Sequence, residues 1–179
     1  RQNNGRACRR KGRCGQRACA MNAPASVTAI EVHFEPLLAQ HLDRVLAVET
    51  RAYAHPWSTV NFLDALQAGY QAQMLVADTT VIGYFVAMQG VEEVHLLNIT
   101  VAPEHQGQGW SRVMLDALML WARGKGAQWA WLEVRVGNMR AQSVYHAHGF
   151  RQVGVRKQYY PADNGVREDA LVMGLRLIS

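Results

Sequence analysis

The stretch from Leu97 to Arg112 constrains this chain most, because it joins an apolar run to a helix through a glycine-rich turn. The run ends at Val101, and Gly107 and Gly109 mark the turn. Beyond the turn, apolar residues recur at the spacing of an amphipathic helix, at Trp110, Val113, Met114, Ala117, Leu118 and Trp121. The order of strand, glycine turn and helix predicts a strand that ends at the amino end of a long helix.

The amino end of that helix has the properties of an anion site. A helix start exposes backbone N–H groups without internal partners and carries the positive end of the helix dipole, so it attracts phosphate. Glycines at the turn let a diphosphate approach the backbone without a Cβ in the way. Many ordinary strand-to-helix turns also contain glycine and bind nothing. The glycine pair by itself therefore leaves two interpretations open, an anion cradle and a plain turn.

Length and composition favour one folded domain. The 179 residues are enough for a single domain with a sizeable core, which we place at residues 21–179. Since no run approaches the roughly 18 apolar residues of a membrane span, we expect a soluble protein without a membrane partner. Residues 21–179 contain no cysteine, so this domain needs no disulfides, which is compatible with the cytoplasm.

The net charge of +5 comes from residues 1–20, which contain seven Lys or Arg and no acidic residue. Residues 21–179 carry a formal charge of −2. Such a basic segment can contact nucleic acid phosphates, but only without sequence specificity. It lacks the apolar region of a secretory signal, and Met21 begins a stretch that resembles a natural start. We expect residues 1–20 to be an extension without a fold.

Neither the cysteines nor the histidines have the pattern of a metal site. The three cysteines all lie in residues 1–20, at spacings unlike those of zinc ligands; they are Cys8, Cys14 and Cys19. His146 and His148 stand two apart on an expected helix and therefore point apart, and the other histidines are scattered. We expect no bound metal.

Periodicity along the chain predicts an α/β fold. We expect strands over 30–34, 73–77, 81–88, 94–101, 129–136, 150–155 and 170–177. We expect helices after Pro36, from Ser58 to about Ala68, after the glycine turn as far as Gly124, and from Asn138 to Gly149. The strand at 129–136 has little polar content, which favours cover on both of its faces.

Glu133 interrupts this apolar strand. Burial of a carboxylate without a partner disfavours its charged form, which suits a general base. The alternative is a structural ion pair with Arg135, which shares its face of the strand, or with another cation. Glu93 and His95, two apart on an earlier strand, are a weaker pair of candidates for the general base. The residues alone leave these interpretations open.

Two aromatic residues are also ambiguous. Tyr145 lies on the apolar side of the last expected helix, where most tyrosines are core residues, yet a phenol can donate a proton to a departing thiolate. Trp57 lies at a bend between Pro56 and the expected helix cap Ser58. It can cover the core or line a substrate groove.

Several segments resemble the GNAT superfamily of acetyl-CoA-dependent N-acetyltransferases, and within it the bacterial RimI family. The glycine turn is similar to the Gln/Arg-x-x-Gly-x-Gly/Ala motif, except that Ser111 stands where the family prefers Gly or Ala. The other matching segments are Arg51–Ser58, Leu97–Pro103, Trp131–Asn138, Ala141–Phe150, Tyr159–Pro161 and Arg167–Met173. The resemblance extends over residues 30–178 and implies a single mixed, mostly antiparallel sheet with helices on both faces.

The resemblance also implies a reaction and a set of site residues. The acetyl group of acetyl-CoA would pass directly to the N-terminal alanine of ribosomal protein S18, with Glu133 as proton acceptor and Tyr145 as proton donor. The coenzyme-binding residues would be Ile99, Thr100, Val101, Gly107, Gln108, Gly109, Trp110, Ser111, Arg112 and Asn138. The first three would hold the acetyl-pantetheine arm through their backbone, and Gly107 to Arg112 the pyrophosphate. Trp57 and Tyr159-Tyr160 would line the peptide groove.

Two other functions remain open beside the acetylation of ribosomal protein S18. One is a GNAT enzyme that acetylates another protein N-terminus, a lysine or a small amine. The other is a noncatalytic coenzyme-binding or ribosome-associated module with the basic segment as its anchor. The oligomeric state does not follow from the sequence.

Overall fold

The computed structural model describes residues 31–162 and 165–177. Several expectations therefore lie outside the described residues. They concern the basic segment 1–20 with its three cysteines, the start of the first strand at Ile30, and Asp163 and Asn164 in the last turn.

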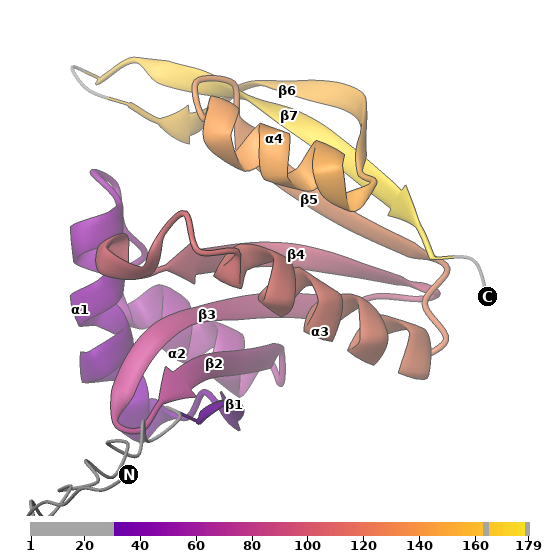
Figure 1. Ribbon diagram of the computed structural model, residues 1–179. Coiled ribbons are helices and arrows are strands. Elements are labelled where there is room, and N and C mark those ends of the chain that lie inside the picture. Colours follow the sequence, from indigo (N-terminus) through magenta and orange to yellow (C-terminus); the bar gives the residue numbers. More distant parts are fainter. Residues whose placement is uncertain (1–30, 163–164, 178–179) are drawn as a thin grey trace, which may run out of the picture.

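The fold is built on one seven-stranded sheet with the strand order β1-β2-β3-β4-β5-β7-β6 (Figure 1). The strands are β1 (Val32–Pro36), β2 (Gln71–Ala77), β3 (Thr80–Gln89), β4 (Glu93–Val101), β5 (Trp129–Arg135), β6 (Arg151–Pro161) and β7 (Arg167–Arg176). All neighbouring strands are antiparallel except β4 and β5. This confirms the predicted mixed, mostly antiparallel sheet.

Helices cover the sheet on both faces, as predicted. They are α1 (Leu42–Ala52), α2 (Thr59–Gln67), α3 (Trp110–Gly124) and α4 (Met139–His148), with 3-10 turns at Ala39–His41 and Pro103–His105. Two apolar cores result, one with α1 and α2 and the other with α3 and α4. Successive side chains of a strand point to opposite faces, so in β3 Tyr84 joins the first core and Phe85 the second.

The helix ends follow the predicted capping residues. The Ser58 hydroxyl accepts a hydrogen bond from the Asn61 backbone N–H at 3.3 Å, and α2 begins at the next residue. Asn138 caps α4 in the same way, by accepting from the Ala141 N–H at 3.0 Å. Gly149 ends α4 in the left-handed conformation with a φ of 110°.

Two expectations about the strands need correction. β5 is not covered on both faces: its buried residues alternate with partly exposed ones, and the Trp129 side chain is 37% exposed. Helix α4 lies over this part of the sheet, whereas α1 and α2 pack with β2 and β3. β6 also continues to Pro161 instead of ending near Val155, because β7 pairs with it again beyond a register shift between Arg156 and Tyr160.

The two parallel strands separate in the middle of the sheet. β4 and β5 pair only from Glu93 to Leu96 and from Trp129 to Leu132. A register shift of β4 against β3 leaves Leu97 as the extra residue of a bulge at this point. Beyond it the strands diverge, as Figure 1 shows. The facing edges of the two strands therefore have no backbone partner in each other, and we call this opening the wedge.

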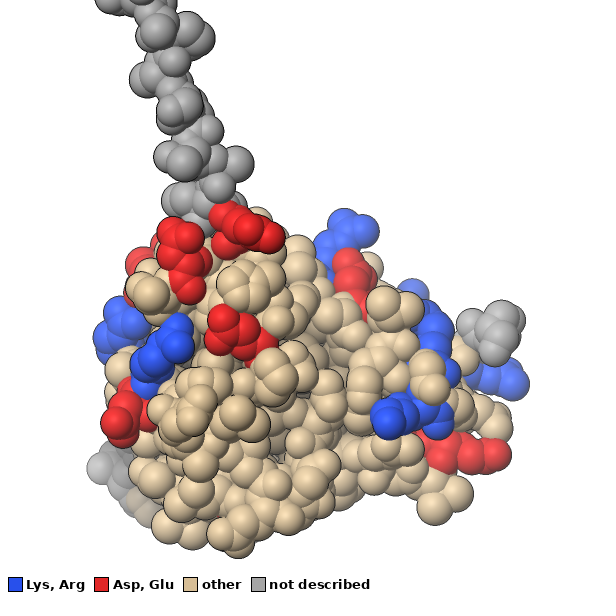
Figure 2. Space-filling view, turned by 90° about the horizontal axis from the view of Figure 1, so that it is seen from below, with Lys and Arg blue, Asp and Glu red and all other residues tan. Residues whose placement is uncertain are grey.

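The surface of the described residues has no strong segregation of charge on the face shown in Figure 2. There, basic and acidic side chains lie in small mixed groups around a broad uncharged area. None of the described helices is long and apolar enough to span a membrane.

Candidate active site

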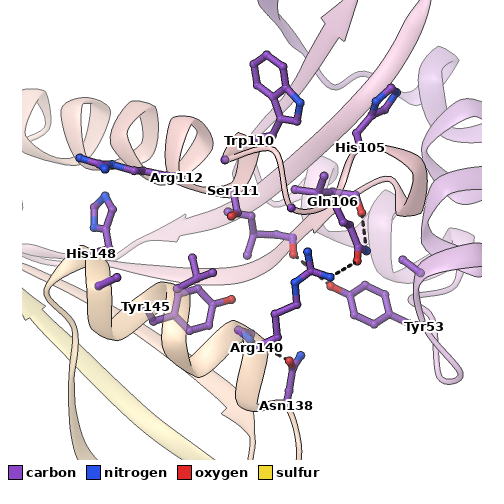
Figure 3. Close-up of a pocket in the computed structure, with 18 residues that line it drawn as sticks. Tyr53, His105, Gln106, Trp110, Ser111, Arg112, Asn138, Arg140, Tyr145 and His148 are labelled. Carbon is purple, nitrogen blue, oxygen red and sulfur yellow. Dashed lines mark hydrogen bonds between the residues drawn. The ribbon is translucent and has the colours of Figure 1, made fainter.

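A cavity of about 650 Å³ opens where β4, the glycine turn and the first turns of α3 face α4 (Figure 3). We call it the glycine-turn cavity. It is lined by eight of the ten predicted coenzyme-binding residues, namely Ile99, Val101, Gly107, Gly109, Trp110, Ser111, Arg112 and Asn138. Residues that are far apart in the sequence thus meet at one site.

The other two predicted residues, Thr100 and Gln108, do not line this cavity. Thr100 points to the opposite face of β4 from its two neighbours and is buried there. The Gln108 side chain is engaged within the turn, where it donates to the Glu104 carbonyl at 3.3 Å and accepts from the Trp110 indole N–H at 3.1 Å.

The glycine turn presents bare backbone to the cavity. Gly107 and Gly109 have φ angles of 80° and 88°, a region that side chains rarely allow. A Cβ on Gly109 would have no atom within 4 Å, and one on Gly107 would meet only the Arg140 guanidinium, at 3.6 Å. No side chain caps the start of α3, so its first N–H groups are available to an acceptor from outside. The turn has the geometry of an anion cradle.

The carbonyl groups of β4 at the wedge are held by side chains. The Tyr53 hydroxyl donates to the Ile99 carbonyl at 3.2 Å, and the Gln106 amide donates to the Val101 carbonyl at 3.1 Å. Both carbonyls point away from β3, on the edge that β5 leaves unpaired. A ligand in the glycine-turn cavity could use this edge as a further strand would.

Arg140 is a residue of this site that the sequence analysis missed. It lies in the first turn of α4 and donates to the Gln106 side-chain oxygen at 2.8 Å across the cavity (Figure 3). One signal was present in the sequence. A cation in the first turn of a helix opposes the helix dipole, so its presence there indicates a separate role.

A second cavity of about 630 Å³ lies on the other side of the wedge. We call it the carboxylate cavity, because Glu49 and Glu133 both line it. Tyr145 and Asn138 line both cavities, as do Tyr53, Ile99 and Ala141. The two cavities therefore meet at Tyr145, and the predicted proton acceptor and proton donor lie at the same site.

Glu133 has a cationic partner, although not the one next to it in the strand. Its carboxylate lies 3.2 Å from the Arg156 guanidinium of β6, while Arg135 pairs with Glu168 at 3.0 Å. The Glu133 side chain is 12% exposed, and half of the Arg156 side chain is in solvent. The Tyr160 hydroxyl donates to the Glu133 carbonyl at 3.0 Å. Glu133 thus forms an ion pair with a cation from a distant strand, and because it also lines the carboxylate cavity, its role as a general base stays a prediction.

Tyr145 is almost fully buried in α4. Burial, together with the nearby phenols of Tyr53 and Tyr160, raises the pKa of Tyr145 above its ordinary value, so the hydroxyl keeps its proton. In Figure 3 the Tyr53 and Tyr145 hydroxyls point toward the middle of the cavity from opposite sides. Tyr145 is therefore a core residue whose protonated hydroxyl faces the cavity, and its role as proton donor stays a prediction.

Glu49 is a second residue that the sequence analysis did not assign to the site. Glu49 is 1% exposed, and its carboxylate accepts four hydrogen bonds. The donors are the Trp57 backbone N–H at 2.8 Å, the Asn98 amide and the Thr100 hydroxyl at 3.3 Å each, and the Tyr84 hydroxyl. Burial and Glu49 raise the pKa of Tyr84, which therefore stays a donor. The signal was an acidic residue on the apolar face of an amphipathic helix.

Trp57 packs on the core and also lines a cavity, and a role of that cavity in substrate binding stays a prediction. Its ring packs edge-on against Phe62 at 5.3 Å between centroids, and it also lines the carboxylate cavity. Tyr160 lines the same cavity. Tyr159 does not, and its ring lies 5.3 Å from the Arg156 guanidinium.

Glu93 and His95, the other candidates for the general base, lie at the opposite end of β4 from the residues that line both cavities. Glu93 and His95 are 3.4 Å apart, but they stand at the start of β4 and line neither cavity. Glu93 and Ile99 are six positions apart, which is about 20 Å along a strand. Among residues 31–162 and 165–177, no three His, Cys, Asp or Glu side chains group as metal ligands.

The sheet with its wedge, the glycine turn and the two cavities are the features of one class of transferase. The model of the Acetyltransferase (GNAT) family matches residues 42–150, and the chain belongs to this family.

Among individual proteins, the chain is similar to the ribosomal protein bS18-alanine N-acetyltransferase of Haemophilus ducreyi, with 34% identity over 80% of this chain and 99% of the relative. It is similar to the enzyme of the same name from Escherichia coli, with 34% identity over 72% of this chain and 86% of the relative. The crystal structure of the Escherichia coli enzyme superposes with a TM-score of 0.77 and 31% identity, over 83% of this chain and 96% of that one.

Proposed function

We propose that this protein transfers the acetyl group of acetyl-CoA to the N-terminal alanine of ribosomal protein S18. The observation that carries the proposal is the similarity to enzymes named for this reaction, over 99% of the length of one of them. The two cavities that meet at Tyr145 support it, because acetyl transfer needs a coenzyme and an amine to meet from two sides. Acetylation of a ribosomal protein would take place in the cytoplasm.

The glycine-turn cavity would hold the coenzyme, which supplies a thioester carbonyl as the electrophile. The first N–H groups of α3 and the glycine turn would bind the diphosphate, since no side chain caps this helix. The backbone of Ile99 and Val101 would hold the pantetheine arm along the open edge of β4. Arg112, Ser111 and Asn138 would complete the binding site.

The carboxylate cavity would hold the amine of the substrate. Glu133 would remove a proton from the terminal ammonium, directly or through a water molecule, and the free amine would attack the thioester. Arg156 would hold the Glu133 carboxylate through their ion pair, and Trp57 and Tyr160 would form walls of the peptide groove.

Tyr145 would donate its proton to the departing sulfur and would regain one from the attacking nitrogen, which loses its second proton as the amide forms. Its raised pKa keeps the phenol protonated at neutral pH, and its position between the cavities gives it access to the reacting centre. A backbone N–H near Val101 would stabilise the negative charge that develops on the carbonyl oxygen. The proposed steps need neither a covalent enzyme intermediate nor a metal ion.

A steady-state assay on purified protein tests the proposal most directly. We expect acetylation of a peptide with the S18 N-terminus to be far more efficient than that of lysine peptides or polyamines. Mass spectrometry of S18 from a strain that lacks this protein should show a free N-terminal alanine. An acetylated S18 in that strain would refute the proposed substrate, and coenzyme binding without any turnover would favour the noncatalytic module.

A further inference from the structure

Arg140 carries a positive charge that the described residues do not neutralise. Within the described residues Arg140 has no carboxylate within 4 Å, and of the seven Arg or Lys residues there for which this holds it alone lines the glycine-turn cavity. It also stands in the first turn of α4, where the helix dipole disfavours a cation. An unneutralised cation at an unfavourable helix position, on the wall of a cavity, indicates a negatively charged ligand.

The same side chain closes a bridge across the glycine-turn cavity. Arg140 donates to the Gln106 side-chain oxygen at 2.8 Å, and the Gln106 amide donates to the Val101 carbonyl at 3.1 Å. This chain of two hydrogen bonds runs from α4 to the open edge of β4 (Figure 3). It engages a carbonyl of the strand edge that the pantetheine arm would use under the proposed function.

The Arg140 guanidinium is already close to the anion cradle. One of its terminal nitrogens would lie 3.6 Å from a Cβ on Gly107. A guanidinium has five N–H donors, and Gln106 accepts from one nitrogen only. A small rotation of this exposed side chain would bring the remaining donors toward a diphosphate on the turn, and a planar guanidinium binds such oxygens in pairs.

We propose that Arg140 is an exchangeable ligand of the coenzyme diphosphate. Without coenzyme, Arg140 is held by Gln106 and the bridge spans the cavity. When coenzyme binds, its arm replaces the Gln106 amide at Val101, and Arg140 exchanges the Gln106 oxygen for diphosphate oxygens. This inference rests on the proposed function, because it takes coenzyme A as the ligand of the cavity. It predicts that the bridge opposes binding of the arm while Arg140 favours binding of the diphosphate.

Calorimetric titration of the full chain with two probes separates these effects. Coenzyme A contains both the arm and the diphosphate, whereas pantetheine contains the arm alone. For Arg140→Ala we expect the affinity for coenzyme A to fall roughly tenfold, because a charge-assisted bidentate contact is lost. The affinity of Arg140→Ala for pantetheine should not fall. In Gln106→Ala the affinity for pantetheine should rise by about threefold, because the Gln106 amide no longer competes with the arm for the Val101 carbonyl. Arg123→Ala is the matched control, since it removes the same charge from the exposed end of α3.

The outcomes distinguish this inference from the proposed function. If the unaltered protein does not bind coenzyme A, the proposed function fails. If it binds coenzyme A and Arg140→Ala binds equally well, only the role of Arg140 is refuted. An equal loss of affinity for both probes would assign Arg140 a purely structural role. A crystal structure with coenzyme A should show the guanidinium on the diphosphate and no longer on Gln106.

Discussion

The two cavities that meet at Tyr145 are built in different ways. Half of the residues that line the glycine-turn cavity come from one continuous stretch between Ile99 and Arg112, in which Gly107 and Gly109 expose the backbone, and most of the others come from α4. The carboxylate cavity is lined by residues from several separate segments, namely α1, the segment before α2, β4, β5, α4 and β6, and two of its lining residues, Glu49 and Glu133, are carboxylates. One cavity depends on the conformation of a turn, and the other depends on a network of distant residues.

This difference between the cavities predicts how substitutions in each of them affect function and stability. Substitutions in the carboxylate cavity should change the chemical step or the stability of the fold. Substitutions in the glycine turn should change coenzyme affinity, with little effect on the chemical step once coenzyme is bound. The proposed difference between the cavities is refuted if variants of the carboxylate cavity and variants of the glycine turn change kcat, stability and coenzyme affinity in the same way.

The largest effect is expected for Glu133→Gln. The amide has nearly the same shape but cannot accept a proton from the ammonium, so kcat should fall by about a hundredfold or more. Binding of coenzyme A should be unchanged, because Glu133 does not line the glycine-turn cavity. Steady-state kinetics and calorimetry measure the two quantities.

Glu93→Gln is the matched control for this variant. It removes the other candidate base, which lines neither cavity, and should leave kcat unaltered. A large loss in Glu93→Gln with full activity in Glu133→Gln would contradict the assignment of the base.

Glu49→Ala should destabilise the protein by about 3 kcal/mol, because it leaves buried donors without an acceptor. These donors include the Trp57 N–H and the Tyr84 hydroxyl. Urea unfolding measures the loss, and Glu49→Gln should lose less, since it keeps one acceptor oxygen. In Glu49→Gln the KM for the peptide should rise, because Trp57 lines the carboxylate cavity, while coenzyme affinity stays constant. An unchanged KM would reduce Glu49 to a purely structural residue.

Tyr145→Phe should lower kcat by roughly tenfold to a hundredfold through loss of the proton donor. The Tyr145 hydroxyl has no hydrogen-bond partner in the described part of the chain, so the stability of the variant should change little. Tyr70→Phe, outside both cavities, is the control.

The pKa of Tyr145 is raised, so the phenol stays protonated above the ordinary tyrosine value of about 10. The rate of the unaltered enzyme should therefore not fall through loss of this proton as the pH rises toward 10. A decline near pH 8 that disappears in Tyr145→Phe would contradict this.

Local features of the fold were predictable from the sequence. The helix caps at Ser58 and Asn138, the glycine turn and the long helix after it all depend on residues close together in the chain. The predicted coenzyme-binding residues were found together for the same reason, since most of them belong to one stretch.

Features that depend on pairing between distant segments were not predictable. The partner of Glu133 is Arg156, because β7 places β6 near β5, and no spacing along the chain shows this. The same holds for the donors to Glu49, which come from three segments. The Thr100 side chain lies buried on the other face of β4 from its two neighbours, and its predicted contact with the coenzyme through the backbone stays a prediction.

The glycine turn offers the smallest and best controlled test of the comparison. Gly109 and Gly126 stand at the two ends of α3 with φ angles of 88° and 77°, and a Cβ on either would have no atom within 4 Å. Gly109→Ala and Gly126→Ala should therefore lose the same stability in urea unfolding, about 1 kcal/mol for a side chain in the left-handed region. Only Gly109 lines the glycine-turn cavity, so only Gly109→Ala should weaken coenzyme A binding, by roughly fivefold to tenfold, because its methyl group would stand where the diphosphate approaches. Equal affinities in the two variants would mean that the diphosphate does not contact this turn, and the backbone origin of the coenzyme site would have to be abandoned.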